Sequence, residues 1–336
     1  MAPVISSISP VQGPAAGGTA VTVTGTGFTG VTGVKFGSAA AAYVVVSATK
    51  ITATAPAGSG APSVTVTTPG GTSNGVTYTY VAAPVVSSVS PTQGPTTGGN
   101  TVTVTGTGFT GATSVLFGSV SVAFTVVSAT QITATAPAAP VAPVAVTVVT
   151  PGGTSNGVLY FYVPPPTVAT VSPSMGPVAG GNTVTITGTS LTLATAVRFG
   201  TGAATALTVV SDDQITVQAP SGSGTVAVTV TTPGGTSLPG VGSASYTYVP
   251  LPVINALTPS QVPTSGGSAV TISGSSLGLA QSVLIGGAAA PFVAISDSEL
   301  VAISPSGAPG PVTVKVTTPG GVSNTATYQL VAGPLI

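Results

Sequence analysis

The sequence contains no cysteine and no histidine, and only eight of its 336 residues carry a charge. Without cysteine no disulfide can stabilise the fold, and the sequence leaves the redox compartment undetermined. Histidine and cysteine are also the commonest ligands of transition metals, so the usual zinc sites are excluded. No serine or threonine has a plausible base partner in the sequence either. These absences predict a protein that is not an enzyme, with no catalytic, cofactor-binding or metal-binding residue and no cofactor.

The charged residues make up 2% of the chain, whereas about 25% is usual in soluble proteins. The four cations and four anions give a formal net charge of zero. They are Lys35, Lys50, Arg198, Lys315, Asp212, Asp213, Asp297 and Glu299. Recognition of a nucleic-acid backbone needs clustered lysine and arginine to neutralise phosphates, so the scattered cations exclude a nucleic-acid partner.

The sequence also lacks long hydrophobic runs, although 43% of its residues are hydrophobic. A membrane-spanning helix needs about 20 apolar residues in succession. The run 39–46 has eight residues, and the stretch 137–149 is interrupted by two prolines. We therefore expect no membrane insertion. Residues 1–3 lead directly into the first repeat, and no basic and apolar segments of a secretory signal are visible in this chain.

What the sequence does contain is a repeat of about 82 residues that occurs four times. One anchor is a Ser/Thr-Pro turn, followed by two glycines, whose prolines are Pro10, Pro91, Pro173 and Pro259. A second anchor is a Pro-Gly-Gly turn that begins at Pro69, Pro151, Pro233 and Pro319. The last repeat is offset by four further residues, and these fit at 238–242 in the third copy. The anchors predict modules at 1–82, 83–163, 164–249 and 250–336.

Within each repeat, apolar residues alternate with hydroxyl residues. Val21 and Val23 alternate with Thr22 and Thr24, and the other three copies repeat the pattern. This period of two is typical of a strand with one buried face. Short alternating strands separated by turns indicate a two-sheet sandwich, since a single sheet would leave an apolar face in water. We predict an all-β protein of four β-sandwiches arranged end to end.

The same residues carry a family resemblance. The segment from Val21 to Phe28, the Phe36-Gly37 pair and the Pro-Gly-Gly turn before Tyr78 are similar to the IPT/TIG module of bacterial or bacteriophage type. Copy three departs from it at Ser190-Leu191, and copy four at Val262 and Ile285. The resemblance implies an immunoglobulin-like fold. It leaves function open, because this module serves unrelated roles in plexins, transcription factors and bacterial surface proteins.

Two motifs could be mistaken for ligand sites. The glycine pairs lack the helix and lysine of a phosphate loop, so we interpret them as turn glycines with positive φ. Acidic residues stand before one strand in copies three and four, at Asp212-Asp213 and at Asp297 with Glu299. Carboxylates can bind calcium, but copies one and two have Lys50 and Gln131 at this place. We therefore interpret the acidic residues as solvated turns.

The tyrosines near the end of each repeat could stack on sugars or proteins, or pack inside. They are Tyr78, Tyr80, Tyr160, Tyr162, Tyr246, Tyr248 and Tyr328. Because the members of a pair occupy alternate positions of a strand, we expect one of each pair in the core. We assign most of the group to packing.

Short joints that contain proline connect the repeats and favour a semi-rigid spacer, a rod on the order of 150 Å. A surface almost without charge offers little repulsion between molecules, which promotes association. The leading hypothesis is a non-enzymatic structural rod that self-assembles into, or is incorporated in, an extracellular, cell-surface or virion structure, with itself or other structural subunits as partners. The alternatives are a surface adhesin or carbohydrate-binding array, whose partners are glycans or proteins, and accessory domains of a larger secreted protein.

Overall fold

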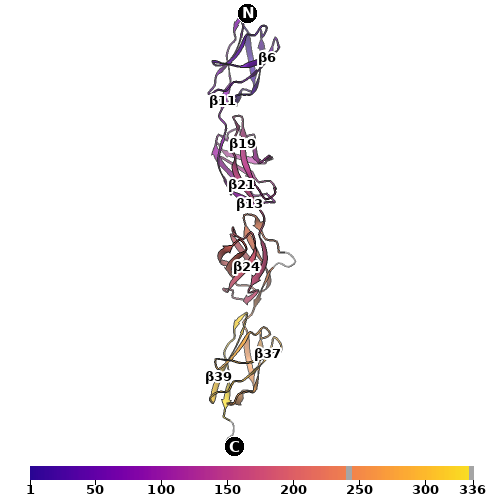
Figure 1. Ribbon diagram of the computed structural model, residues 1–336, viewed down its shortest axis with the longest axis vertical. Helices are drawn as coiled ribbons and strands as arrows, with labels where there is room; N and C mark the ends of the chain where they lie inside the picture. Colours follow the sequence, from indigo (N-terminus) through magenta and orange to yellow (C-terminus); the bar gives the residue numbers. More distant parts are fainter. Residues whose placement is uncertain (240–243, 333–336) are drawn as a thin grey trace. The chain divides into compact units, whose positions relative to one another are not determined.

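The computed structural model describes residues 1–239 and 244–332. Within these ranges every regular element is a β-strand, so the prediction of an all-β fold is confirmed (Figure 1). The chain divides into two compact units, Met1–Pro164 and Pro165–Ile336. Each unit contains two of the predicted modules, which we call modules 1 to 4 in chain order.

Unit 1 holds the strands β1 to β21. In module 1 they are β1 (Val4–Ser9), β2 (Gln12–Pro14), β3 (Ala20–Thr26), β4 (Gly33–Phe36), β5 (Ala39–Ala40), β6 (Ala42–Ser47), β7 (Lys50–Thr54), β8 (Ser63–Thr68), β9 (Gly71–Thr72), β10 (Val76–Thr77) and β11 (Thr79–Val81). In module 2 they are β12 (Val85–Ser90), β13 (Gln93–Pro95), β14 (Thr101–Thr107), β15 (Ser114–Phe117), β16 (Val120–Val122), β17 (Phe124–Ser128), β18 (Gln131–Thr135), β19 (Pro143–Thr150), β20 (Gly153–Thr154) and β21 (Val158–Val163).

Unit 2 holds the strands β22 to β41. In module 3 they are β22 (Thr167–Ser172), β23 (Met175–Pro177), β24 (Thr183–Thr189), β25 (Ala196–Phe199), β26 (Gly202–Ala203), β27 (Thr205–Ser211), β28 (Gln214–Gln218), β29 (Gly224–Thr232), β30 (Gly235–Thr236) and β31 (Ser245–Val249). In module 4 they are β32 (Val253–Thr258), β33 (Gln261–Pro263), β34 (Ala269–Ser275), β35 (Ser282–Ile285), β36 (Ala288–Ala289), β37 (Phe292–Ala294), β38 (Glu299–Ile303), β39 (Gly310–Thr318), β40 (Gly321–Val322) and β41 (Ala326–Val331).

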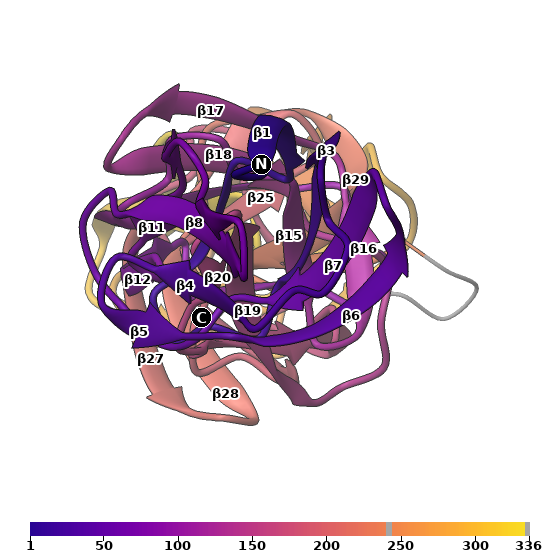
Figure 2. The ribbon, with the colours of Figure 1, turned by 90° about the horizontal axis from the view of Figure 1, so that it is seen from above.

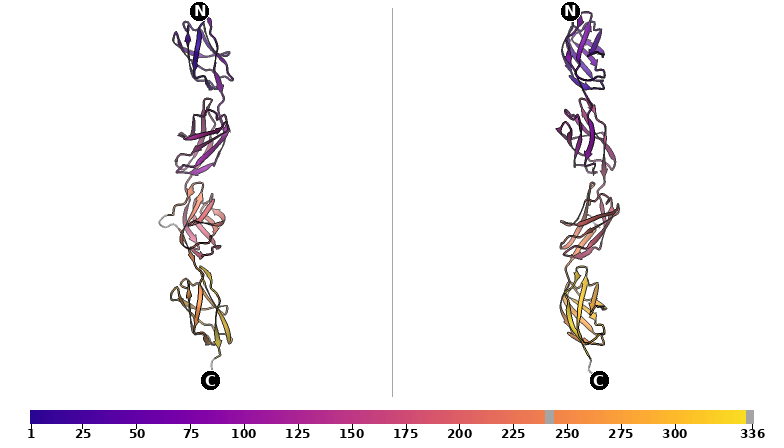
Figure 3. Two further views of the ribbon diagram at one scale, coloured as in Figure 1. Left: turned by 180° about the vertical axis from the view of Figure 1, so that it is seen from behind. Right: turned by 90° about the vertical axis from the view of Figure 1, so that its left-hand side faces the viewer.

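Modules 2, 3 and 4 (Figure 3) each contain a four-stranded and a six-stranded sheet, whereas in module 1 the second sheet is divided into a five-stranded sheet and the separate pair β2-β11. The first sheet has four strands, in the order β1-β3-β7-β6 in module 1, and the other modules repeat this order. The second sheet is centred on the long strand that precedes the Pro-Gly-Gly turn, such as β19 in module 2. The last strand of each module pairs in parallel with the short strand after the opening proline, as β21 does with β13.

The alternation of valine and threonine places the core between the sheets. Val21 and Val23 of β3 are fully buried and lie opposite Ala53 and Ile51 of β7. Four separate hydrophobic clusters result, one inside each module. At about 25 cal/mol per Å² of apolar surface, burial of these side chains is the main stabilising contribution in a chain without disulfides.

The glycine pairs are turn glycines, as predicted. Gly17 and Gly18 have φ values of 79° and 86°, and the three equivalent pairs also have positive φ. Side chains other than glycine rarely adopt this conformation. The backbone N–H of the second glycine, Gly18, donates to the Ala55 carbonyl. The pair therefore fixes the turn that leads into β3, and the phosphate-loop interpretation has no support from this geometry.

An asparagine after the Pro-Gly-Gly turn clamps the first strand of three modules. The side-chain amide of Asn156 accepts from the Val86 N–H and donates to the Val86 carbonyl. Asn74 and Asn324 make the same pair of bonds to Ile5 and Ile254. Module 3 has Leu238 at this position, and Leu238 is exposed. The insertion that we predict at 238–242 begins there, and 240–242 lie outside the described residues.

Candidate functional surfaces

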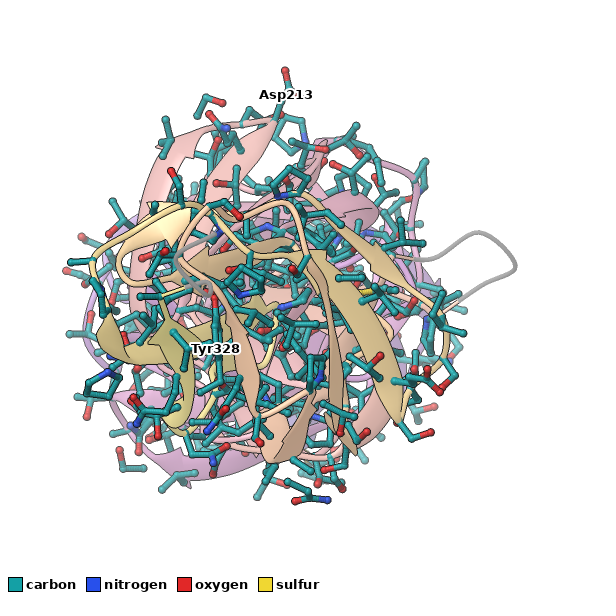
Figure 4. The ribbon with its side chains drawn as sticks, turned by 90° about the horizontal axis from the view of Figure 1, so that it is seen from below. Asp213 and Tyr328 are labelled. Atoms are coloured by element: carbon teal, nitrogen blue, oxygen red, sulfur yellow. The ribbon has the colours of Figure 1, made fainter. Side chains whose placement is uncertain are left out.

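The tyrosines near the end of each module pack inside its hydrophobic core and do not form an exposed binding surface. We call each buried tyrosine, with the residues that contact it, the tyrosine base of the module. All seven are buried, so the expectation that only one member of each pair lies inside is wrong. Residues two apart on a strand point to the same face, which puts both members in the core. In module 2 the ring of Tyr160 makes edge-to-face contacts with Phe117 and Tyr162, with centroids 5.3 and 5.1 Å apart. Figure 4 shows Tyr328 of module 4, which is buried in the same way.

The buried hydroxyls of these tyrosines have different partners in different modules. The Tyr160 hydroxyl donates to the Asn100 Oδ1 at 3.0 Å and accepts from its Nδ2 at 2.8 Å. The Tyr328 hydroxyl lies 2.6 Å from the Ser304 hydroxyl. The Tyr78 hydroxyl, beside Thr19, has no hydrogen-bond partner among the described residues. Burial, and secondarily the nearby Tyr160, raises the pKa of Tyr162 to about 12.

The acidic turns lie at the surface, as predicted. Asp212, Asp213, Asp297 and Glu299 are all exposed, and Figure 4 shows Asp213 pointing away from the protein. The Asp212 carboxylate accepts a hydrogen bond of 2.7 Å from the Thr192 hydroxyl, which lowers the pKa of Asp212. Among residues 1–239 and 244–332, no three His, Cys, Asp or Glu side chains come together in a way that could hold a metal ion.

The structure reveals exposed apolar edges that the repeat pattern alone did not predict. In every module the strand at one edge of the four-stranded sheet, β6, β17, β27 or β37, exposes valine or isoleucine. In module 1 these residues are Val44, Val45 and Val46, and Figure 2 shows β6 at the outside of that module, beside β7. We call these four segments the valine edges. A Val-Val-Ser sequence before a turn is the signal that could have identified three of them.

Module 2 carries a second apolar surface, on the outer face of its other sheet. Leu159 and Phe161 of β21 are both exposed and lie opposite Ala145 and Pro143 of β19. The residues equivalent to Phe161 are polar in the other modules, namely Thr79, Thr247 and Gln329. Module 2 is therefore the only repeat with an exposed aromatic ring at this place in the described structure.

The segment that enters a module lies against that module's Pro-Gly-Gly turn. A methyl group at Gly152 of module 2 would overlap the carbonyl oxygen of Ala82, which lies just before the module's first strand. In module 4, Gly320 stands in the same relation to Pro250. Glycine is required at these positions because the backbone of the joint approaches so closely.

The fold and the repeats define a class: a tandem array of immunoglobulin-like β-sandwiches. A model of the IPT/TIG domain matches residues 3–80, 84–162, 166–248 and 252–330. The chain therefore belongs to the IPT/TIG domain family, and the resemblance found in its motifs is confirmed.

Several solved structures are similar in fold. The plexin A4 full extracellular region is 22% identical, with a TM-score of 0.37, and the match covers 94% of this chain but only 29% of that one. SGBP-B from a complex xyloglucan utilization locus in Bacteroides uniformis is 18% identical, with a TM-score of 0.25, and the match covers 98% of this chain and 100% of that one. Invasin, a bacterial integrin-binding protein, is 15% identical with a TM-score of 0.29 and covers 97% and 78%. These similarities concern the fold alone.

Residues 1–239 and 244–332 contain no helix that is long and apolar enough to cross a membrane.

Proposed function

We propose that this chain is a non-enzymatic structural protein: a stiff array of sandwich modules that associates with further copies, or with other structural subunits, in an extracellular, cell-surface or virion assembly. The observation that carries this proposal is the combination of closed, self-contained cores with surfaces almost free of charge. Each module buries its terminal tyrosines, and its exposed apolar residues, Phe161 of module 2 among them, lie on sheet edges and outer faces.

The joints support stiffness. Because Gly152 and Gly320 have no space for a side chain against Ala82 and Pro250, the entering segments of modules 2 and 4 are held by contact rather than by a free tether. Prolines in these segments restrict the backbone further. A spacer needs this property, since flexible joints would let the modules move independently.

Small-angle X-ray scattering of the full chain tests the stiffness. We expect a maximum dimension close to that of an extended array, and a shorter average dimension for the Gly152→Ala variant. Gly33→Ala is the matched control, because no atom lies within 4 Å of a methyl group built at Gly33. A flexible-chain profile for the unmodified protein would contradict the proposal.

Phe161 favours a second candidate, the adhesin or carbohydrate-binding array. An exposed aromatic ring on an uncharged surface can stack on a sugar ring or anchor a protein contact. Screening the full chain against immobilised glycans and extracellular proteins tests this candidate. Binding that disappears in Phe161→Thr, the residue that modules 1 and 3 have at this position, would support it, whereas equal binding by both proteins would exclude this surface.

A further inference from the structure

Each valine edge is the outermost strand of its sheet: one side is paired, and the other side leaves backbone groups and apolar side chains available. β6 and β37 each lie last in their sheet, so one side of each strand has no neighbour. Val44 of β6 is 66% exposed, and Val293 of β37 is 63% exposed. Natural proteins usually protect such edges with charges, prolines or bulges, since an apolar edge recruits another strand. A contact with a further strand is therefore the expected use of these edges.

The charges are placed next to these edges, and their signs differ along the chain. The turn after β6 leads to Lys50 at the start of β7. The corresponding turn of module 2 has no charge, and that of module 3 has Asp212 and Asp213. The turn after β37 in module 4 contains Asp297 and leads to Glu299. Five of the eight charged residues of the chain thus flank a valine edge, positive in module 1 and negative in modules 3 and 4.

The edge of module 4 is a better partner for module 1 than the edge of module 3. β27 of module 3 pairs with its neighbour through two irregularities, and its Ala206 has a positive φ of 51°. β6 has a single register shift, between Val45 and Ser47, and its residues 42–45 pair regularly with β7. Repeated irregularities twist an edge strand away from a further strand, so β27 is the poorer partner. In contrast, β37 pairs with β38 without a register shift and is followed by Ile295, which is 60% exposed.

We propose that the valine edge of module 1, beside Lys50, docks on the valine edge of module 4, beside Asp297 and Glu299, of a second copy of this chain. The two edges bring complementary charges and apolar side chains to one contact. This inference rests on the proposed self-association and specifies its surface and its polarity. A contact between two different surfaces leaves one of each unused at the ends of a pair, so the same contact can add further copies without closing.

The two kinds of residue have separate tasks in this contact. Exposed ion pairs contribute little affinity, but they discriminate between right and wrong partners. The valines supply the apolar area that leaves water. Pairing of two module 1 edges would place two Lys50 ammonium groups together, and pairing of two module 4 edges would bring four carboxylates together. Like charges therefore favour the mixed contact.

Sedimentation velocity of the full chain, from about 1 to about 100 micromolar, measures the association. We expect oligomers that grow with concentration and that weaken when the salt rises from about 25 to about 500 mM. The double variant Val44→Thr with Val46→Thr keeps the shape and strand propensity of the edge, and we expect it to weaken association about tenfold. The control is Val126→Thr with Val127→Thr in the uncharged module 2, at the counterparts of Val45 and Val46, and it should associate like the unmodified chain.

Charge reversal tests the polarity. Lys50→Glu makes both edges negative, and the pair Asp297→Lys with Glu299→Lys makes both positive. We expect each variant alone to associate about tenfold more weakly and a mixture of the two to recover the original association. Lys35→Glu is the control, because Lys35 is also exposed but lies on β4 of the other sheet.

The outcomes separate this inference from the proposed function. Association that is unchanged in the edge and charge variants would leave self-assembly in place and overturn the assigned surface. Equal effects of Lys50→Glu and Lys35→Glu would overturn it too, since net charge alone would then decide. A chain that remains monomeric over the whole concentration range would overturn both the surface and the self-association.

Discussion

The tyrosine bases of modules 2 and 4 contain equivalent buried tyrosines, Tyr160 and Tyr328, in two different surroundings. In module 2 the Tyr160 hydroxyl lies between Asn100 and Gly94, where a methyl group would overlap it. In module 4 the position of Gly94 is taken by Val262, which is buried, and the Tyr328 hydroxyl is bonded to Ser304. Modules 1 and 3 have glycine at this position, as module 2 does.

The residues that surround the tyrosine also differ between the two modules, together with the partner of its hydroxyl. Phe117 and Tyr162 surround Tyr160 in module 2, whereas Ile285 and Leu330 are the buried residues at these positions in module 4. The comparison teaches that one buried hydroxyl constrains several neighbours at once. A valine at the glycine position is compatible with the tyrosine only where another group receives the hydroxyl.

The largest effect is expected from Gly94→Val, which puts the residue of module 4 into module 2. The new side chain overlaps the Tyr160 hydroxyl, so we expect a loss of about 3 kcal/mol in the free energy of unfolding of module 2. Hydrogen exchange followed by mass spectrometry resolves the modules within the full chain. Adding Ala136→Ser, the counterpart of Ser304, should recover part of the loss. A variant as stable as the original chain would show that the two bases do not depend on this residue.

Ser304→Ala removes the hydrogen-bond partner of the buried tyrosine in module 4. It leaves the buried Tyr328 hydroxyl without its partner, so we expect a loss of about 1–3 kcal/mol. The exposed Ser306 provides the control, since Ser306→Ala should change the stability by less than about 0.5 kcal/mol. Exchange rates in β38 and β41 give the measurement. Equal rates in the two variants would argue against a role for the hydroxyl pair.

High pH should affect module 2 through Tyr162, a buried tyrosine at the position where module 4 has Leu330. The pKa of Tyr162 is raised to about 12 in the folded protein, above the value of about 10 expected when unfolded. The folded state therefore holds this proton more tightly, and its stabilising contribution is complete below pH 10 and is lost as the pH rises toward 12. We expect module 2 to lose stability across this interval, and Tyr162→Leu, which copies Leu330, to lose less. Absorbance of tyrosinate with circular dichroism monitors both events.

The smallest expected effect is an increase in the stability of module 1. Thr19 occupies in module 1 the position of Asn100, and the Tyr78 hydroxyl has no partner among the described residues. Thr19→Asn should supply one and stabilise module 1 by about 0.5–1.5 kcal/mol. Thermal unfolding and exchange in β11 measure the change. A neutral or destabilising result would indicate that the asparagine of module 2 matters for its backbone position rather than for its bond.

The sequence predicted the sheets better than the surfaces. The alternation of Val21 and Thr22 reports which face of a strand is buried, and the period of two extends to every module. The same rule should have placed both Tyr160 and Tyr162 inside, since they are two positions apart. Alternation says nothing about which strand lies at an edge, so the exposure of Val45 and Val46 needed the strand order. The partner of the Tyr328 hydroxyl lies 24 positions away in the chain, beyond any local pattern.

The parallel pairing of each module's last strand with the short strand near its start has a mechanical consequence. β2 runs beside β11, and β13 beside β21, in the same direction. A tension that pulls a module by its two ends slides these strands past each other in shear, so their hydrogen bonds carry the load together instead of opening one by one. A chain of such modules would resist stretching inside every module, without a disulfide to hold it together.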